Sequence, residues 1–139
     1  MTSTTSPQLG QIHALLAERG YDVSEPADDV LKITEVQSGV SLQAVLQGEI
    51  IFFSLPCISV PEASITPEMM GLMLAANNGI STSHFQLHDG GDDTVTITLN
   101  NFCKLQDMGA DDEDDILSCV HFLLVDVIAA KHLLADLKG

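Results

Sequence analysis

The sequence has very little positive charge. Its 139 residues include only five Lys and Arg but 20 Asp and Glu, which gives a formal net charge of −15 at pH 7. Binding to phosphate backbones and to anionic lipid surfaces relies on clustered Lys and Arg. We therefore expect no binding to nucleic acid. The acidic surplus favours either simple solubility or a basic protein partner.

Cysteine is also scarce. Cys57, Cys103 and Cys119 form an odd set without a C-x-x-C spacing, so neither a disulfide framework nor a thiolate zinc site is predicted. Free thiols suit a reducing cytoplasm. The first residues, MTSTTSPQ, lack the basic and apolar regions of a signal peptide. These observations predict a cytoplasmic protein.

Long hydrophobic runs are absent. The longest, from Phe122 to Ala130, is interrupted by Asp126 and is much shorter than the roughly 20 residues that span a bilayer. Apolar residues nevertheless make up 45% of the chain, which is enough for one sizeable core. We expect a single α+β domain over residues 7–139, a disordered N-terminus over residues 1–6, and no membrane insertion.

Motifs of common enzyme classes are missing too. The chain contains no H-E-x-x-H, no G-x-G-x-x-G and no phosphate loop. Ser41 lies in GVSLQ, which lacks the second glycine of a nucleophile elbow. Cys119 and His121 point about 200° apart on a helix and cannot form a catalytic dyad. We predict no catalytic residue, no cofactor and no enzymatic activity.

What the chain does have is a long apolar pattern at its C-terminal end, Asp111 to Lys138. Apolar residues recur there at alternating spacings of four and three, which predicts a helix with one apolar stripe: Ile116, Val120, Leu123, Val127, Ala130, Leu134 and Leu137. Further apolar residues flank the stripe, so the helix must be covered on more than one side. We expect a sheet on one face and another element or a second subunit on another.

Asp126 is unusual because it is a carboxylate among the apolar residues of this helix. A buried carboxylate without a polar contact is costly. We therefore predict that Asp126 has a partner such as a backbone amide, a lysine or water, in a structural role.

The rest of the chain predicts shorter elements. In order these are a helix from Pro7 that stops at Gly20, a loop over Ser24–Asp29, strands over Val30–Val36, Val40–Leu46 and Glu49–Leu55, a helix from Pro67 closed by Asn77, and a hairpin of Ser83–Asp89 and Thr94–Asn100. The Glu49–Leu55 strand is apolar on both faces, which is typical of a central strand covered on both sides and here limited by Pro56. Residues 100–110 lead to the long helix as a connection. The predicted order is α-β-β-β-α-β-β-α, an antiparallel sheet packed by helices.

That order, the small acidic chain and the run from TPEMMGLMLAANN through FQLHDGGDDTVTITL resemble the type III secretion chaperone-like fold. Within this fold the sequence is most similar to the small bacterial YbjN-like and YjfI-like proteins, from about Pro7 to Leu137. The resemblance implies a non-enzymatic, chaperone-like or regulatory homodimer that holds a segment of another protein through an apolar groove or sheet edge. It supplies no catalytic residues.

The second helix carries the candidate partner-binding residues. Met69, Met70 and Met73 could form an adaptable surface because thioethers repack around varied partners, and Asn77 follows them at the end of the helix. The alternative for the methionines is core filling.

A metal-dependent enzyme or sensor remains the alternative function. The run of Asp111, Asp112, Glu113, Asp114 and Asp115 could bind a divalent cation or a basic partner, but carboxylates in a first helical turn also complement the helix dipole, and we favour that role. His84 and His88 would lie about 13 Å apart on a strand, and His121 and His132 about 16 Å apart on a helix. Neither pair can chelate one ion alone, so we predict no metal site, although a composite site stays open.

Overall fold

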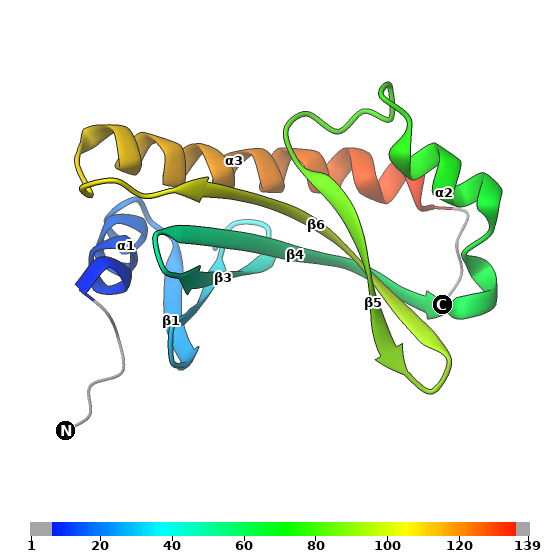
Figure 1. Ribbon diagram of the computed structural model, residues 1–139, viewed down its shortest axis with the longest axis horizontal. Coiled ribbons are helices and arrows are strands. Elements are labelled where there is room, and N and C mark those ends of the chain that lie inside the picture. The colour runs from blue at the N-terminus through cyan, green and yellow to red at the C-terminus, as the bar shows by residue number, and fades with distance from the viewer. Residues whose placement is uncertain (1–6, 136–139) are drawn as a thin grey trace. The chain divides into compact units, whose positions relative to one another are not determined.

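The computed structural model describes residues 7–135. Its elements, drawn in Figure 1, are α1 (Pro7–Glu18), β1 (Asp22–Ala27), β2 (Val30–Thr34), β3 (Ser41–Gln47), β4 (Ile50–Pro61), a 3-10 turn (Glu62–Ser64), α2 (Pro67–Leu74), β5 (His84–Gly91), β6 (Thr94–Lys104) and α3 (Ala110–Leu133). The strands form an antiparallel sheet in the order β1-β2-β3-β4-β6-β5. The predicted α+β class is confirmed, with one strand more than the sequence indicated.

Contacts between residues divide the chain into two compact units. Of the described residues, unit 1 comprises 7–54 and 102–121, and unit 2 comprises 55–101 and 122–135. β4, β6 and α3 each contribute residues to both units. The single domain over residues 7–139 stays a prediction, and the disordered terminus predicted for residues 1–6 lies outside the described residues.

In unit 1, α1 and the beginning of α3 cover one face of the sheet. α1 lies beside β1 (Figure 1), and its apolar positions Leu9, Ile12, Leu15 and Leu16 are buried. Burial alternates along β2 and β3, as expected when a sheet has one covered face. The rest of the core of unit 1 comes from the covered face of the sheet, from the residue after β6 and from α3. These residues are Leu31, Ile33, Leu42, Ala44, Leu46, Ile51, Phe53, Leu105, Ile116 and Val120.

The loop predicted for Ser24–Asp29 is wrong, because β1 occupies most of it. Asp22, Val23 and Ser24 pair with β2, after which the register shifts before Ala27. Pro26 lies at this irregularity, where the missing N–H does little harm. β1 is an edge strand with mostly exposed side chains, so it needs almost none of the apolar pattern that reveals a strand.

The limit predicted at Pro56 is also wrong, since β4 continues to Pro61. β3 pairs with β4 only as far as Gln43↔Ser54, so Pro56 lies beyond that pairing. Proline is tolerated where a strand has an open side. β6 likewise extends to Lys104, into residues predicted to be a connection.

Unit 2 contains the second helix and the hairpin. Thr66 caps α2 by accepting a hydrogen bond from Met69 N at 3.1 Å, and Pro67 takes the first turn, as predicted. The hairpin strands pair Phe85↔Leu99 and Leu87↔Ile97. The buried cluster of this unit consists of Val60, Met69, Met73, Ile97 and Leu134, with Phe85 and Leu133 packed against it.

α3 confirms the predicted apolar stripe. Ile116, Val120, Leu123, Val127, Ala130 and Leu134 are all buried, and Leu137 lies outside the described residues. The helix ends at Leu133 rather than continuing toward Lys138. Its flank is less covered than expected, since Ile128 and Val125 are exposed. Among the described helices, α3 alone is long and apolar enough to cross a membrane, a test that core helices of soluble proteins also pass.

Candidate protein-binding surface

α2 separates its methionines between two faces. Met69 and Met73 lie in the core of unit 2, so their side chains fill the interior. Met70 is exposed, together with Leu72 and Leu74, the latter with 78% of its surface accessible. Met70 and Leu74 are four residues apart, as are Met69 and Met73, so helical spacing was the signal that could have distinguished the two pairs. The exposed apolar surface of α2 therefore consists of Met70, Leu72 and Leu74.

The side chain of Asn78, rather than that of Asn77, holds the segment after α2. Asn78 Nδ2 donates to Met73 O at 2.6 Å, and Asn78 Oδ1 accepts from Ile80 N at 2.9 Å. Gly79 has a φ of +90°, a conformation that glycine adopts without strain. The side chain of Asn77 is exposed, so it is open to solvent beside the helix end.

Asp126 fixes the same segment from α3. Its side chain is buried, and its Oδ1 and Oδ2 accept hydrogen bonds from Ser81 N at 2.9 Å and Ser83 N at 3.4 Å. The predicted polar partner is thus confirmed as backbone amides. Asp126 has a structural role in unit 2, because it joins the chain between α2 and β5 to the long helix.

β5 is an edge strand that carries little protection against pairing with another strand. The sheet order puts β1 and β5 at its two ends. Natural edges are blunted by proline, lysine or a bulge. β1 has Pro26 and a register shift in its middle. β5, with the sequence HFQLHDGG, contains no proline or lysine, and its register shifts only at the turn, between Asp89 and Gly91. Leu87 of β5 is 43% exposed.

An acidic hollow of about 410 Å³ lies at the turn end of β5 in unit 2. It is lined by Glu62, Leu87, His88, Asp89, Gly91, Asp92, Asp93, Thr94 and Val95. Four of these residues are carboxylates, and Leu87 and Val95 give it an apolar part. Such a lining favours a ligand that combines apolar and basic groups.

The acidic run at the start of α3 is divided by burial. Asp112 is buried and accepts hydrogen bonds from Gln106 N and Met108 N, both at 2.8 Å, so it closes the loop that precedes the helix. Its four acidic neighbours are exposed. Within residues 7–135, no three His, Cys, Asp or Glu side chains gather in a way that could hold a metal ion.

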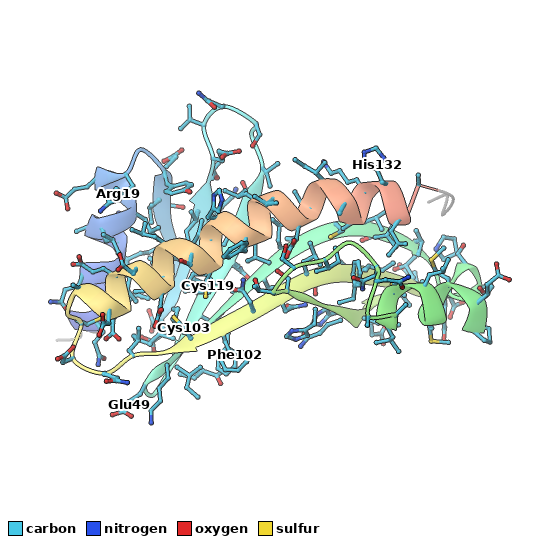
Figure 2. All side chains as sticks on the ribbon, turned by 90° about the horizontal axis from the view of Figure 1, so that it is seen from above. Arg19, Glu49, Phe102, Cys103, Cys119 and His132 are labelled. Carbon is cyan, nitrogen blue, oxygen red and sulfur yellow. The ribbon has the colours of Figure 1, made fainter. Side chains whose placement is uncertain are left out.

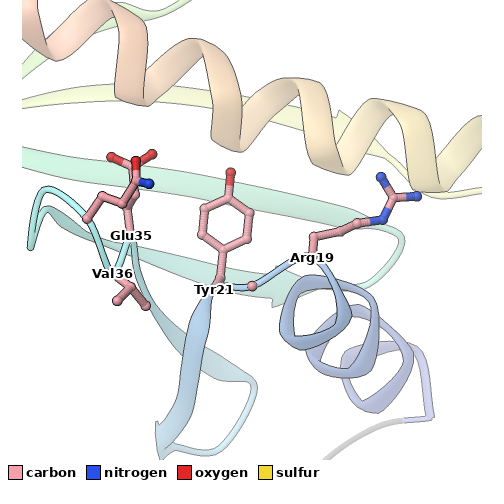
Figure 3. A pocket seen from close by; sticks show the side chains of 6 residues that line it. Arg19, Tyr21, Glu35 and Val36 are labelled. Atoms are coloured by element: carbon pink, nitrogen blue, oxygen red, sulfur yellow. The ribbon is translucent and has the colours of Figure 1, made fainter.

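A second hollow, of about 270 Å³, lies in unit 1 and is shown in Figure 3. Its lining includes Arg19, Tyr21, Glu35 and Val36, with the Tyr21 ring between Glu35 and Arg19 in that view. Burial, with a smaller contribution from the Glu35 carboxylate, raises the pKa of Tyr21 above its usual value. The hollow therefore offers one cation, one carboxylate and a neutral phenol, without a nucleophile and base in contact.

The uncovered face of the sheet in unit 1 carries an aromatic pair. Phe52 of β4 and Phe102 of β6 are 39% and 57% exposed, and their ring centroids are 6.0 Å apart. The expectation that β4 is covered on both sides is wrong within unit 1. The registers Val30↔Val45 and Val45↔Phe52 extend this pair into an apolar row across four strands.

Two cysteines that no sequence spacing brings together meet in unit 1. Cys103 of β6 and Cys119 of α3 are both half-buried, and their thiols are hydrogen-bonded to each other (Figure 2). No sequence spacing indicated this contact, because it depends on how the chain returns from β6 into α3. Cys57 lies in unit 2, and burial raises the pKa of its thiol to about 11.

Comparison with known proteins concerns the fold. No protein-family model matches the sequence, and no curated protein matches it. Among solved structures, the chain is similar to the crystal structure of YbjN from E. coli, a proposed transcription regulator, with 15% identity and a TM-score of 0.68. The match covers 96% of this chain and 97% of that one. The chain therefore has the YbjN-like fold, in agreement with the resemblance found in its sequence.

Proposed function

We propose that the protein is a non-enzymatic binding module, chaperone-like or regulatory, that holds an extended segment of a partner protein along β5 and against α2. The observation that carries this proposal is the exposure of Met70, Leu72, Leu74 and Leu87 on a short helix and an unprotected edge strand of the same unit. Apolar side chains this exposed are typical of an interaction surface when they gather on neighbouring elements. α2 and β5 are in contact with each other.

Strand addition explains how this surface would hold a segment. The backbone N–H and C=O groups on the open side of β5 pair with an added strand, which supplies affinity that depends little on sequence. Burying exposed side chains such as Leu74 and Leu87 contributes about 25 cal/mol per Å² of apolar area. Alternate residues of the segment would face Leu87 and the apolar side of α2, which supplies specificity.

The charge distribution indicates the kind of segment. Glu62, Asp89, Asp92 and Asp93 line the hollow at the end of β5, in a chain with a net charge of −15. A segment with alternating apolar and basic residues complements this surface, and an acidic one is repelled. A regulator of this kind acts through proteins rather than by touching DNA, since the chain lacks the clustered Lys and Arg that DNA binding needs. We place its action in the cytoplasm.

We infer further that the protein works as a homodimer joined through the uncovered sheet face of unit 1. This face carries the row of Val30, Val45, Phe52 and Phe102, beside Lys32 and Lys104. None of the outward residues that β2, β3 and the unit 1 parts of β4 and β6 contribute is a carboxylate. Two copies with a net charge of −15 repel each other least where they meet through such a face.

The alternative of a metal-dependent enzyme or sensor finds no specific support in residues 7–135. Asp112 is engaged with backbone amides, and His88 Nε2 lies 3.1 Å from Thr98 Oγ1. His13 Nδ1 lies 3.4 Å from the Glu25 carboxylate, at the surface of unit 1. Each of these groups has a local structural partner, so the protein-binding proposal explains more of the surface.

A peptide of the length of β5, eight residues, tests the binding proposal. A fluorescent peptide that alternates Val and Lys should bind the protein, and the same peptide with Glu in place of Lys should not. Leu74→Ser and Leu87→Ser should each raise its Kd about tenfold, whereas Val36→Ser, an exposed apolar position in unit 1, should leave it unchanged. Fluorescence anisotropy measures all four proteins. Equal effects of the three variants, or equal binding of both peptides, would contradict the proposal.

A further inference from the structure

We propose that Cys103 and Cys119 form an oxidisable dithiol site, which a hydroperoxide converts into a disulfide between β6 and α3. The site is independent of the protein-binding proposal, because both cysteines lie in unit 1. It rests on a thiol–thiol contact that joins a strand to the helix packed on it, seen in Figure 2.

The backbone around the pair is fixed on both elements. Cys103 is half-buried between the exposed Phe102 and Lys104 at the end of β6, and Leu105, which follows the strand, is buried. Leu105 N donates to Glu49 O at 2.6 Å, which holds the end of β6. Cys119 precedes Val120 of the buried stripe. The two hydrogen-bonded thiols thus meet from elements that are already packed, and we expect them to be able to form an S–S bond of about 2.05 Å.

The loop between the two elements helps to preserve this arrangement. Asp112 accepts hydrogen bonds from Gln106 N and Met108 N, and Gly109 N donates to Asp107 Oδ1 at 3.0 Å. Residues 105–109, which connect β6 to α3, are thus held by hydrogen bonds. A cross-link between Cys103 and Cys119 would add to these contacts.

The shared hydrogen bond makes the two thiols unequal. It lowers the pKa of Cys119, against the opposing effects of burial and the Asp115 carboxylate. It raises the pKa of Cys103, as do burial and the carboxylates of Asp115 and Asp112. The thiolate is the reactive form of cysteine. Cys119 is therefore the attacking sulfur and Cys103 the resolving one.

The reaction consumes one hydrogen peroxide for each disulfide. The Cys119 thiolate attacks one peroxide oxygen, the O–O bond breaks, and hydroxide leaves and takes up the proton that Cys119 released, giving water and a sulfenic acid. The Cys103 sulfur then attacks the Cys119 sulfur. The S–O bond breaks, an S–S bond forms, and the departing hydroxide takes the Cys103 proton as a second water. Two thiols lose two electrons, peroxide gains them, and an added dithiol reverses the change.

Cys57 provides a control within the same chain. Burial raises the pKa of its thiol to about 11, and its Sγ lies 3.7 Å from Leu55 O. At neutral pH this thiol is almost entirely protonated. Cys57 should therefore remain reduced while the pair reacts.

The experiment treats the full-length protein with hydrogen peroxide at pH 7, alkylates the remaining thiols and maps the digested peptides by mass spectrometry. We expect a Cys103–Cys119 disulfide, an alkylated Cys57, and return of all three thiols after dithiothreitol. Cys57→Ser should form the disulfide at the wild-type rate, and Cys103→Ser should stop at a sulfenic acid trapped by dimedone on Cys119. The Cys119→Ser variant should consume hydrogen peroxide at least about tenfold more slowly than the wild-type protein.

Three results would overturn the proposal of an oxidisable dithiol site. They are a wild-type protein whose cysteines all stay reduced, a disulfide that includes Cys57, and a Cys119→Ser variant that consumes peroxide as fast as Cys57→Ser. The first two results come from the wild-type protein, so they do not depend on the folding of the three serine variants. Circular dichroism verifies that folding separately.

Discussion

At the scale of single residues, the fold buries two carboxylates in the described chain, Asp112 and Asp126. Each accepts hydrogen bonds from two backbone amides, Asp112 in unit 1 and Asp126 in unit 2. A buried carboxylate without such donors is strongly unfavourable. Both residues therefore fix the course of an irregular segment. This role explains why a carboxylate occupies each of these two buried positions of α3.

Asp126→Ala should destabilise the protein by about 2–4 kcal/mol, since it leaves the Ser81 and Ser83 amides without their acceptor and opens a cavity. Urea unfolding at pH 7 measures the free energy of unfolding. Asp114→Ala, an exposed position on the same helix, should change it by less than about 0.5 kcal/mol. If both variants unfold alike, the Asp126 hydrogen bonds contribute little and our account of this segment is wrong.

At the scale of elements, α2 shows how one short helix serves two environments. Met69 and Met73 face the core, while Met70, Leu72 and Leu74 are exposed. A helix of eight residues has little intrinsic stability in water, so packing and its cap must hold it. The Thr66 hydroxyl and Pro67 at the first position supply the cap at its N-terminus.

Thr66→Ala should lower the free energy of unfolding by about 1 kcal/mol, because the Met69 N–H loses the oxygen that accepts its hydrogen bond. Thr66→Ser keeps that oxygen and should restore most of the loss. Thermal unfolding followed by circular dichroism compares the three proteins. A serine variant as unstable as the alanine variant would show that the methyl group of Thr66, rather than its hydroxyl, stabilises α2.

At the scale of the whole molecule, the charge is unevenly distributed. The chain carries 20 acidic and five basic residues, yet the uncovered sheet face of unit 1 combines Phe52 and Phe102 with Lys32 and Lys104. Exposed aromatic pairs are typical of interface centres. The homodimer proposed above uses this face of unit 1, and the proposed partner-binding surface belongs to α2 and β5 of unit 2.

Light scattering across a hundredfold dilution should give twice the mass of one chain for the wild-type protein. Phe52→Glu and Phe102→Glu place carboxylates in the apolar row and should each shift the protein to a monomer. Val36→Glu adds the same charge at an exposed apolar position outside the row and should remain dimeric. A wild-type protein that is monomeric at every concentration, or equal behaviour of the three variants, would refute the dimer.

Local sequence patterns predict the parts of the fold that a periodic repeat or a helix cap specifies. The stripe of α3, the Thr66–Pro67 start of α2 and the hairpin before α3 follow from repeats of 3.6 and 2 residues and from capping chemistry, which act over a few neighbouring positions. The same local reasoning predicted that Asp126 has a polar partner. It failed for β1 and for Pro56 in β4, where strand pairing rather than composition decided the element.

Which side chains stay exposed, and which residues distant in sequence meet, depends on the packing of the folded chain. Whether Met69 or Met70 is accessible, whether Phe52 is covered, and whether Cys103 contacts Cys119 depend on how separate elements pack. The residues next to a given position in the sequence do not determine these contacts between separate elements. The candidate surface could be predicted as a region from the apolar character of α2, but its exposed members and the thiol pair required the packed sheet and helices.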